Sequence, residues 1–255
     1  MAKMYGLGGV LSGKLGNTVL AVYNGVQVAR QYQPIVANPK SAGQLAQRAK
    51  GNLVGRLSSF VPKAAIFGLG GNSRARRGEF LREALKAARV TSVGGQFVAK
   101  IDNFNLLFSK GATRLSVWSP VLSAVQNFVS VTLTGTSASA MTPEEYASMV
   151  TRLVVVVYRD IDNKIVEVST RIAVKPDQGQ TAVTGIPIAF EGGFTANVYA
   201  IPMSTADGSA ISIDTDLAYL DDQQIAAALT ANSSSLVFSY GQSLFMGTTS
   251  FTPAP

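Results

Sequence analysis

"TRLVVVVYRDIDNKIVEVSTRIAV", residues 151–174, is the stretch that decides the fold of this chain. Five apolar residues run without interruption from Leu153 to Val157, which is typical of a strand that is buried on both faces. The turn residues "DNK", 162–164, then lead into a second β-prone run that begins at Ile165. We therefore expect an antiparallel hairpin whose first strand lies at the centre of a sheet.

Other β-prone segments surround this hairpin in the second half of the chain. Gly, Asp and Pro separate them at short intervals, and Thr142 as a cap with Pro143 at the first helical position predicts a short helix among them. The segments are 127–135, 181–190, 195–204 and 210–216. Their spacing predicts an antiparallel β-sandwich, for which an immunoglobulin-like arrangement is one candidate.

The first half predicts a β-hairpin and two helices, so the whole chain is expected to be an α+β protein. Two β-prone runs flank Asn24-Gly25, a dipeptide typical of two-residue hairpin turns. Ser41 and Gln44 have the spacing of a capping box, which predicts a helix from there to about Phe60. A second helix is expected to end at about Arg89. The predicted apolar faces are Leu45, Ala49, Leu53, Leu57 and Phe60, and Leu81, Ala84, Leu85 and Ala88.

The composition narrows the classes of function. The chain has 255 residues, 47% of them hydrophobic and 15% charged, which is enough to bury a sizeable core. It contains neither Cys nor His, so disulfides, thiol chemistry and Ser-His-Asp or Cys-His sites cannot be built. We expect no enzyme activity, no cofactor and no small-molecule substrate. A secretory signal or a membrane span is not expected either, because no apolar run is long enough.

A group of aspartates in the second half is the one feature that suggests a metal. It lacks the glycine and the glutamate that an EF-hand loop requires. Capping and solvation explain these residues better, so we expect no metal. They are Asp214, Asp216, Asp221 and Asp222.

The charge of the chain is divided between its halves. Residues through Trp118 have a net charge of +14, whereas those from Ser119 onward have −7. Such asymmetry suggests nucleic-acid contact or a polar assembly, and it predicts a boundary near residue 118. We therefore expect a basic hairpin-and-helix domain over 1–118, a β-sandwich domain over 119–220 and an apolar tail over 221–255.

The densest basic cluster is a candidate nucleic-acid contact. It consists of Arg74, Arg76 and Arg77 in a glycine-rich segment and of Arg82, Lys86 and Arg89 on one side of the second helix. Arginine forks suit phosphate oxygens, and nothing nearby offers base readout, so binding would be backbone-dominated and sensitive to salt. An ordinary solvated surface is the alternative reading.

The apolar tail is the candidate assembly element. An uncharged, β-prone segment is an aggregation hazard when it is exposed. We expect it to be strand-paired, either within its own sheet or onto a neighbouring subunit. The candidate contact residues are Phe238, Tyr240, Leu244, Phe245 and Phe251.

Two motifs near the N-terminus carry a resemblance. They consist of Ser12, Gly13, Lys14, Gly16 and Asn17, and of Asn38, Pro39, Gln44 and Arg48. Over about 50 residues the chain resembles an uncharacterised family found in phages and bacterial genomes, many from Bacteroidota. That family has an SGKxGNxV hairpin, an NPx[ST]xxQxxxR helix entry and a β-sandwich-like second half. Its phage setting implies a structural virion component.

The sequence therefore leaves two alternative functions. The first is a structural virion protein of a bacteriophage, capsid or capsid-associated, made in the host cytoplasm and assembled in many copies. Its partners would be copies of itself or other virion proteins, and its basic half would face nucleic acid or an acidic neighbour. The second is a cytoplasmic, sequence-nonspecific nucleic-acid-binding protein with 74–89 as its footprint.

Overall fold

The computed structural model describes residues 13–23, 26–32, 40–70, 72–113, 117–135, 141–205 and 238–253. The chain divides into two compact units, Met1–Gln44 and Leu45–Pro255. The first unit contains a three-stranded antiparallel sheet in the order β1 (Gly13–Leu15), β2 (Thr18–Tyr23) and β3 (Val26–Gln31). The pairing of β2 with β3 confirms the predicted hairpin, whose turn residues Asn24 and Gly25 lie outside the described residues.

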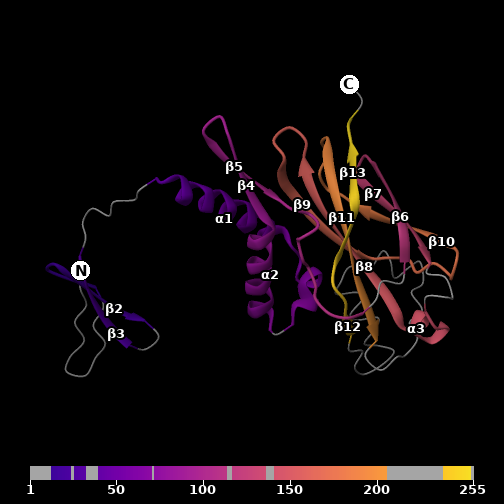
Figure 1. Cartoon of the computed structure of the whole chain (residues 1–255), viewed down its shortest axis with the longest axis horizontal. Coiled ribbons are helices and arrows are strands. Elements are labelled where there is room, and N and C mark those ends of the chain that lie inside the picture. The colour runs from indigo at the N-terminus through magenta and orange to yellow at the C-terminus, as the bar shows by residue number, and fades with distance from the viewer. Residues whose placement is uncertain are drawn as a thin grey trace. The chain divides into compact units, whose positions relative to one another are not determined.

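Two antiparallel sheets dominate the second unit (Figure 1). The smaller has the order β10 (Thr181–Pro187), β7 (Phe128–Gly135) and β6 (Val117–Val125). The larger runs from β9 (Lys164–Ile172) through β8 (Met149–Arg159) to β11 (Phe194–Thr205). On the far side of β11, β12 (Phe238–Tyr240) and β13 (Leu244–Phe251) each pair with a different part of that strand.

This strand order is immunoglobulin-like. With β6 lettered A and β7 lettered B, strands A, B and E (β10) share one sheet, while C (β8), F (β11) and G (β13) share the other. Strand β9 lies beside C. The predicted antiparallel sandwich is therefore confirmed, and so is the hairpin of 151–174, which forms β8 and β9. The predicted segment 210–216 lies outside the described residues, and strand β6 was not predicted.

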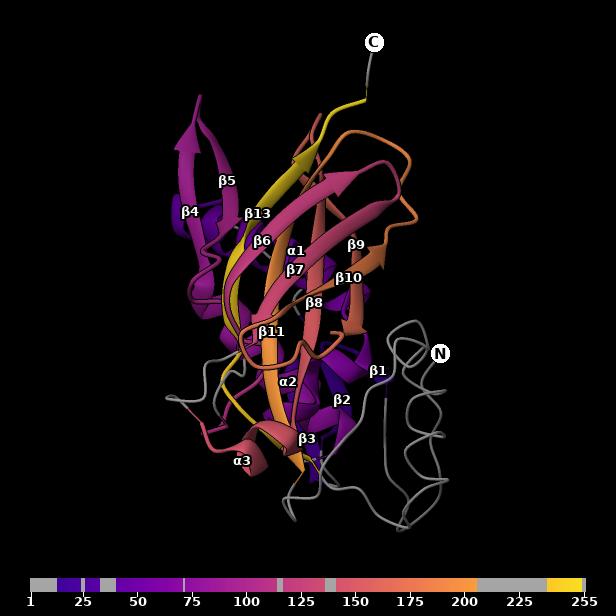
Figure 2. The same ribbon diagram turned by 90° about the vertical axis from the view of Figure 1, so that its right-hand side faces the viewer.

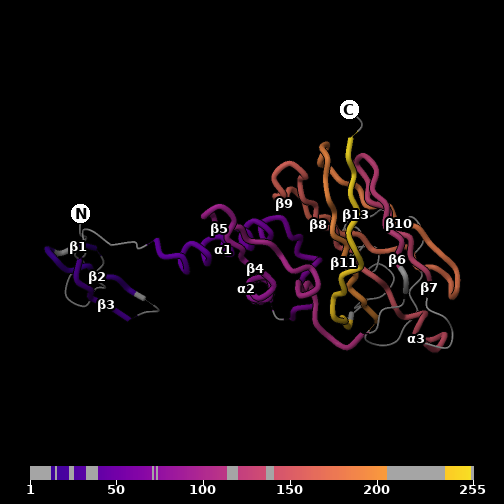
Figure 3. The backbone as a smooth tube through the Cα atoms, turned by 45° about the horizontal axis from the view of Figure 1, so that its top comes forward, coloured from indigo at the N-terminus to yellow at the C-terminus, as the bar shows by residue number. Residues whose placement is uncertain are grey.

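Strand β8 is apolar because both of its faces are covered. Leu153, Val155 and Val157 point into the core between the two sheets. Val154 and Val156 point the other way, into a core that the helices close. All five side chains are fully buried, which explains the uninterrupted apolar run. The second unit therefore has three layers: helices, the larger sheet and the smaller sheet (Figure 3).

The helical layer consists of α1 (Ala42–Phe60), the 3₁₀ helix η1 (Lys63–Leu69) and α2 (Ser73–Ala87). The first predicted helix is confirmed, and Ser41 Oγ accepts the Gln44 N–H at 3.4 Å, which is half of the expected capping box. Between β7 and β8, α3 (Pro143–Ser148) begins with a complete capping box of Thr142 and Glu145, so that short helix is confirmed as well.

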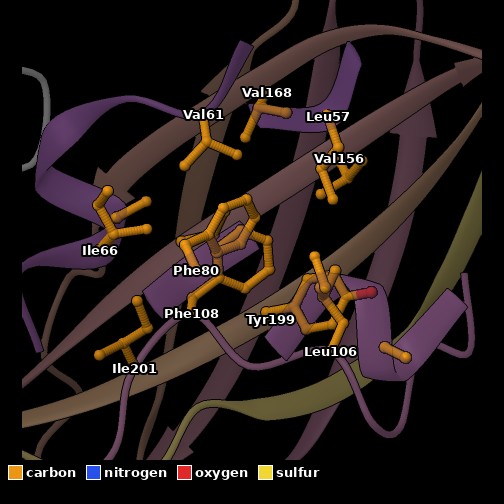
Figure 4. Packing of buried hydrophobic residues seen from close by; sticks show 14 of the residues in the cluster. Leu57, Val61, Ile66, Phe80, Leu106, Phe108, Val156, Val168, Tyr199 and Ile201 are labelled. Atoms are coloured by element: carbon orange, nitrogen blue, oxygen red, sulfur yellow. The ribbon is translucent and has the colours of Figure 1, made fainter. Parts of the chain in front are cut away.

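A cluster of aromatic side chains joins the helices to the larger sheet (Figure 4). The ring of Phe80 on α2 stacks on Phe108 with 5.5 Å between centroids. Phe108 in turn contacts Tyr199 of β11 edge-on at 5.0 Å. All three side chains are fully buried. The expected boundary near residue 118 lies inside this unit, whose core contains residues from both sides of it.

The end of the second helix differs from the prediction. Helix α2 ends at Ala87, and Arg89 lies on β4 (Ala88–Val93), which pairs with β5 (Gln96–Ile101). The cause is the Gly94-Gly95 turn, where φ is 56° and 78°, because such a turn lets 88–101 fold back on itself as a hairpin.

The buried face of α2 also differs from the prediction. It is formed by Phe80, Ala84 and Ala87, whereas Leu85 is 41% exposed. These residues keep the helical spacing, but the face is rotated because it must accommodate Phe80 against Phe108.

Candidate anion-binding groove

A groove of about 620 Å³ lies between η1 and the first turns of α2. Two helical stripes form its sides, since residues three, four and seven apart share a helix face. One side is Lys63, Ile66 and Phe67 from η1, and the other is Arg74, Arg77, Gly78 and Leu81 from α2, with Arg76 at the rim.

The floor of the groove is apolar and partly open. Ile66 is buried in the core beneath it, and Leu81 packs against the same core. The Phe67 side chain is 39% exposed. A β-carbon added at Gly78 would meet no atom within 4 Å, so the floor is open at that position.

The rim of the groove is cationic, and none of the lining residues is acidic. Within the part of the chain that the structure describes, the side chains of Lys63 and Arg74 make no hydrogen bond or ion pair. The guanidinium of Arg76 lies over the Phe67 ring, 4.9 Å from its centroid. Arg77 Nη2 donates to the Val61 carbonyl at 3.2 Å, which positions its side chain along the groove. The arrangement suits an anion, because little in the groove neutralises the positive charge of the residues that line it.

The structure divides the predicted basic cluster into two parts. Arg74, Arg76 and Arg77 meet at the groove. Arg82 and Lys86 instead pair with acids of their own helix, at 2.5 Å to Glu79 and 2.9 Å to Glu83 respectively.

Arg89 lies apart from both of these groups. It is carried by β4 and lies 3.7 Å from the Asp102 carboxylate. Each of the three cations outside the groove thus lies beside a carboxylate, which makes it a weaker candidate for a phosphate contact.

Lys63 and Phe67 line the groove but were not predicted as site residues from the sequence. Lys63 is three residues from Ile66, which is one turn of a 3₁₀ helix, and Phe67 follows directly, so this local signal was available. That the turn would lie against α2 could not be predicted, because it depends on how η1 packs on the shared core.

An ion-pair network joins α2 to the segment that precedes β6. Lys110 Nζ lies 2.7 Å from Glu79 Oε1 and 2.9 Å from Glu83 Oε1. Hydrogen bonds from Lys86 and then Lys110 lower the pKa of Glu83 to about 2. The same network lowers the pKa of Glu79, chiefly through Lys110, and raises that of Lys110.

The Glu83→Gln variant is expected to lose a pH-dependent part of the stability. The pKa of Glu83 is about 2 in the folded chain against an ordinary 4.5, so its contribution is present above about pH 4.5 and is lost as the pH falls towards 2. Because Lys86 and Lys110 are 63% and 41% exposed, we expect only about 1 kcal/mol at neutral pH. Urea unfolding between pH 7 and pH 3 should show the free energies of unfolding of the wild type and the variant approaching one another as the pH falls.

The exposed Glu144→Gln change serves as the control. An equally large difference in the free energy of unfolding at every pH would contradict the role assigned to Glu83.

The candidate assembly residues have contacts inside the chain. Tyr240 and Phe245 pack against the core beneath the helices, and Phe251 packs against the core of the sandwich, with its ring 5.8 Å from that of Phe194. Leu244 is 43% exposed. Phe238 begins β12, and nothing is described of its side chain. Since β12 and β13 both pair with β11, this part of the tail completes its own sheet.

A second pocket, of about 270 Å³, offers less chemistry. It lies between α1, the β4–β5 hairpin and the larger sheet. Among the described residues that line it, Lys100 is the one charged residue. Several of its neutral polar groups are already paired: Asn103 Oδ1 accepts from Tyr199 Oη at 3.2 Å, and Thr248 Oγ1 donates to Asn197 Oδ1 at 2.8 Å. Paired neutral groups leave little for a ligand.

The described part of the chain does not bring together three carboxylates that could hold a metal ion. The aspartates at 214, 216, 221 and 222 lie outside it. Among the helices described, none is both long and apolar enough to cross a bilayer.

The fold and the groove together define a class of protein: an immunoglobulin-like sandwich with a helical layer that carries a cationic, acid-free groove. No protein-family model, curated protein or solved structure matches the chain.

Proposed function

We propose that this chain is a structural protein of a bacteriophage particle, capsid or capsid-associated, which acts by assembly and binding rather than by catalysis. Its place would be the virion, and its partners would be copies of itself or other virion proteins. The resemblance of the N-terminal motifs supports the phage setting. The division of charge supports a basic part that faces nucleic acid or an acidic neighbour.

The observation that carries the assembly proposal is the outer face of the β6–β7–β10 sheet, which faces the viewer in Figure 2. Wherever these strands pair, the residues on that face are uncharged. Val121 and Val183 flank Thr132 across the sheet and are 64% and 59% exposed. Val125 and Phe128 form a second apolar row, separated from the first by Ser123, Ser130 and Gly185, and are 54% and 45% exposed.

A second copy of this chain is the partner that such a face suits. Each chain has a formal net charge of +7, so two copies repel one another wherever basic surfaces meet. The uncharged sheet face lets them approach without that repulsion. Face-to-face packing of two sheets would also bury the valines of both copies, as inside a β-sandwich.

Changing Val121 and Val183 to lysine is expected to weaken self-association by about tenfold or more, which corresponds to about 1.4 kcal/mol. The reason is that lysines of both copies would then meet across the contact. Sedimentation velocity over a range of protein concentrations, with electron microscopy of the largest species, measures the effect. Ile161→Lys is the matched control, because Ile161 is 94% exposed on the turn between β8 and β9. A wild-type chain that stays monomeric at high concentration would overturn the assembly proposal.

The cationic groove favours one alternative, a cytoplasmic protein that binds nucleic acid without sequence preference. Lys63, Arg74 and Arg77 line it with no acidic residue among them. A chain that stays monomeric yet binds nucleic acid would favour this alternative over a virion protein.

A further inference from the structure

We infer that the groove between η1 and α2 binds single-stranded nucleic acid, with phosphates against Lys63, Arg74 and Arg77 and a base against Phe67. This inference rests on the nucleic-acid contact within the proposed function and names the class of ligand for it. It does not depend on whether the chain assembles.

The rim supplies the phosphate contacts. Lys63 and Arg74 come from opposite sides of the groove, and neither is engaged by another described residue. Arg77 is already held at one nitrogen by the Val61 carbonyl, which leaves the rest of its fork for a phosphate oxygen. The paired cations Arg82 and Lys86 lack this property.

The floor supplies a surface for a base. Phe67 is 39% exposed in the middle of a basic groove, where an aromatic ring contributes nothing to a contact with phosphate alone. The guanidinium of Arg76 lies over the ring, 4.9 Å from its centroid. An exposed aromatic ring beside cations is how proteins bind single strands, because every base has a face that can stack.

The same features argue against two other ligands. A duplex keeps its base faces stacked inside, so it would use the cations and leave Phe67 without a role. A phosphoserine or acidic peptide would also use the cations, but its charged side chains carry no flat ring for the apolar floor. A single strand is the ligand that uses both parts of the groove.

Gly78 allows the floor to be tested apart from the charge. A β-carbon at this position meets no atom within 4 Å, and a substitution there removes no charge. Methionine favours helices, so Gly78→Met should fill the groove without unfolding α2. Gly51 on α1 is a matched control, because a β-carbon there also meets no atom within 4 Å.

The experiment is a fluorescence-anisotropy titration of the full chain with labelled oligothymidylate and with a duplex of equal length, at several salt concentrations. We expect the single strand to bind about tenfold more tightly than the duplex. Gly78→Met and Phe67→Ala should each weaken single-strand binding by about tenfold, in line with the loss of one stacked base, while Gly51→Met should not.

The cations are tested by salt dependence. Arg74→Gln combined with Arg77→Gln should reduce the slope of log affinity against log salt by about 1.4, since each lost single-strand phosphate contact removes about 0.7. Thermal unfolding of each variant verifies that it is folded.

Different outcomes would overturn different statements. Equal binding of duplex and single strand, with Gly78→Met without effect, would overturn this inference and leave a general basic contact in place. A phosphoserine peptide that competes as well as the oligonucleotide would also overturn it. No binding to either nucleic acid at low salt would overturn the nucleic-acid contact as well, while sedimentation still decides the assembly proposal separately.

Discussion

Replacing Phe80 with alanine is expected to lower the free energy of unfolding by about 3–5 kcal/mol. Phe80 is fully buried and stacks on Phe108, so its removal leaves a cavity between the helical layer and the larger sheet. Chemical denaturation would measure the loss. Phe104→Ala is the control: its ring also contacts another ring, that of Phe245 at 5.0 Å, but it is 80% exposed, and we expect a loss of about 1 kcal/mol or less.

The same variant tests whether the helices and the sandwich unfold together. Trp118, the one tryptophan of the chain, lies on β6 and is paired with Thr134, so we expect its fluorescence to follow the unfolding of the sandwich, while far-UV circular dichroism follows the helices. If they form one cooperative unit, as the shared core indicates, both signals should shift together in Phe80→Ala. A tryptophan transition that does not move would show that the sandwich is independent of the helical layer.

Replacing Gly111 with alanine is expected to destabilise the chain by about 3 kcal/mol or more. Its φ of 148° is unfavourable for any residue with a side chain. The new β-carbon would also lie 1.9 Å from the Tyr240 carbonyl oxygen, so the backbone at the end of β12 would have to move. The substitution should therefore also weaken the pairing of β12 with β11.

Gly179→Ala separates the two causes. Gly179 also has a positive φ, 75°, but a β-carbon there would meet nothing within 4 Å. We expect it to cost about 1 kcal/mol, through backbone conformation alone. Thermal denaturation of the two variants measures the difference, and equal losses would mean that the contact with Tyr240 costs nothing.

Local patterns were enough to predict most of the elements. The β-prone stretch of 151–174 predicted two strands and a turn, and the Thr142 cap predicted the start of α3, because these signals depend on neighbouring residues only. The Gly94-Gly95 turn was equally local, yet it was overlooked because the helical pattern before it was extended to Arg89.

Pro202 illustrates what local patterns cannot explain. It lies within β11, in the interior of the larger sheet, where a proline is normally excluded because it cannot donate to the ladder. Its carbonyl accepts the N–H of Gly241, in the gap between β12 and β13. In a strand the amide nitrogen and the carbonyl of one residue point to the same side, so the missing donor faces that gap. The proline is tolerated because the neighbouring strand is interrupted there.

The sequence by itself determined the class of fold, the central strand, the absence of cysteine and histidine chemistry, and the division of charge. Only the tertiary structure decided which cations remain without acidic partners. Arg82 and Lys86 pair with acids three residues away on their own helix, which spacing alone allows. That Arg89 lies beside Asp102, and that Lys63 and Arg74 meet across a groove without an acid, follows only from the fold. The physical reason is that spacing sets which charges can pair within one element, while the packing of elements sets which charges meet between them.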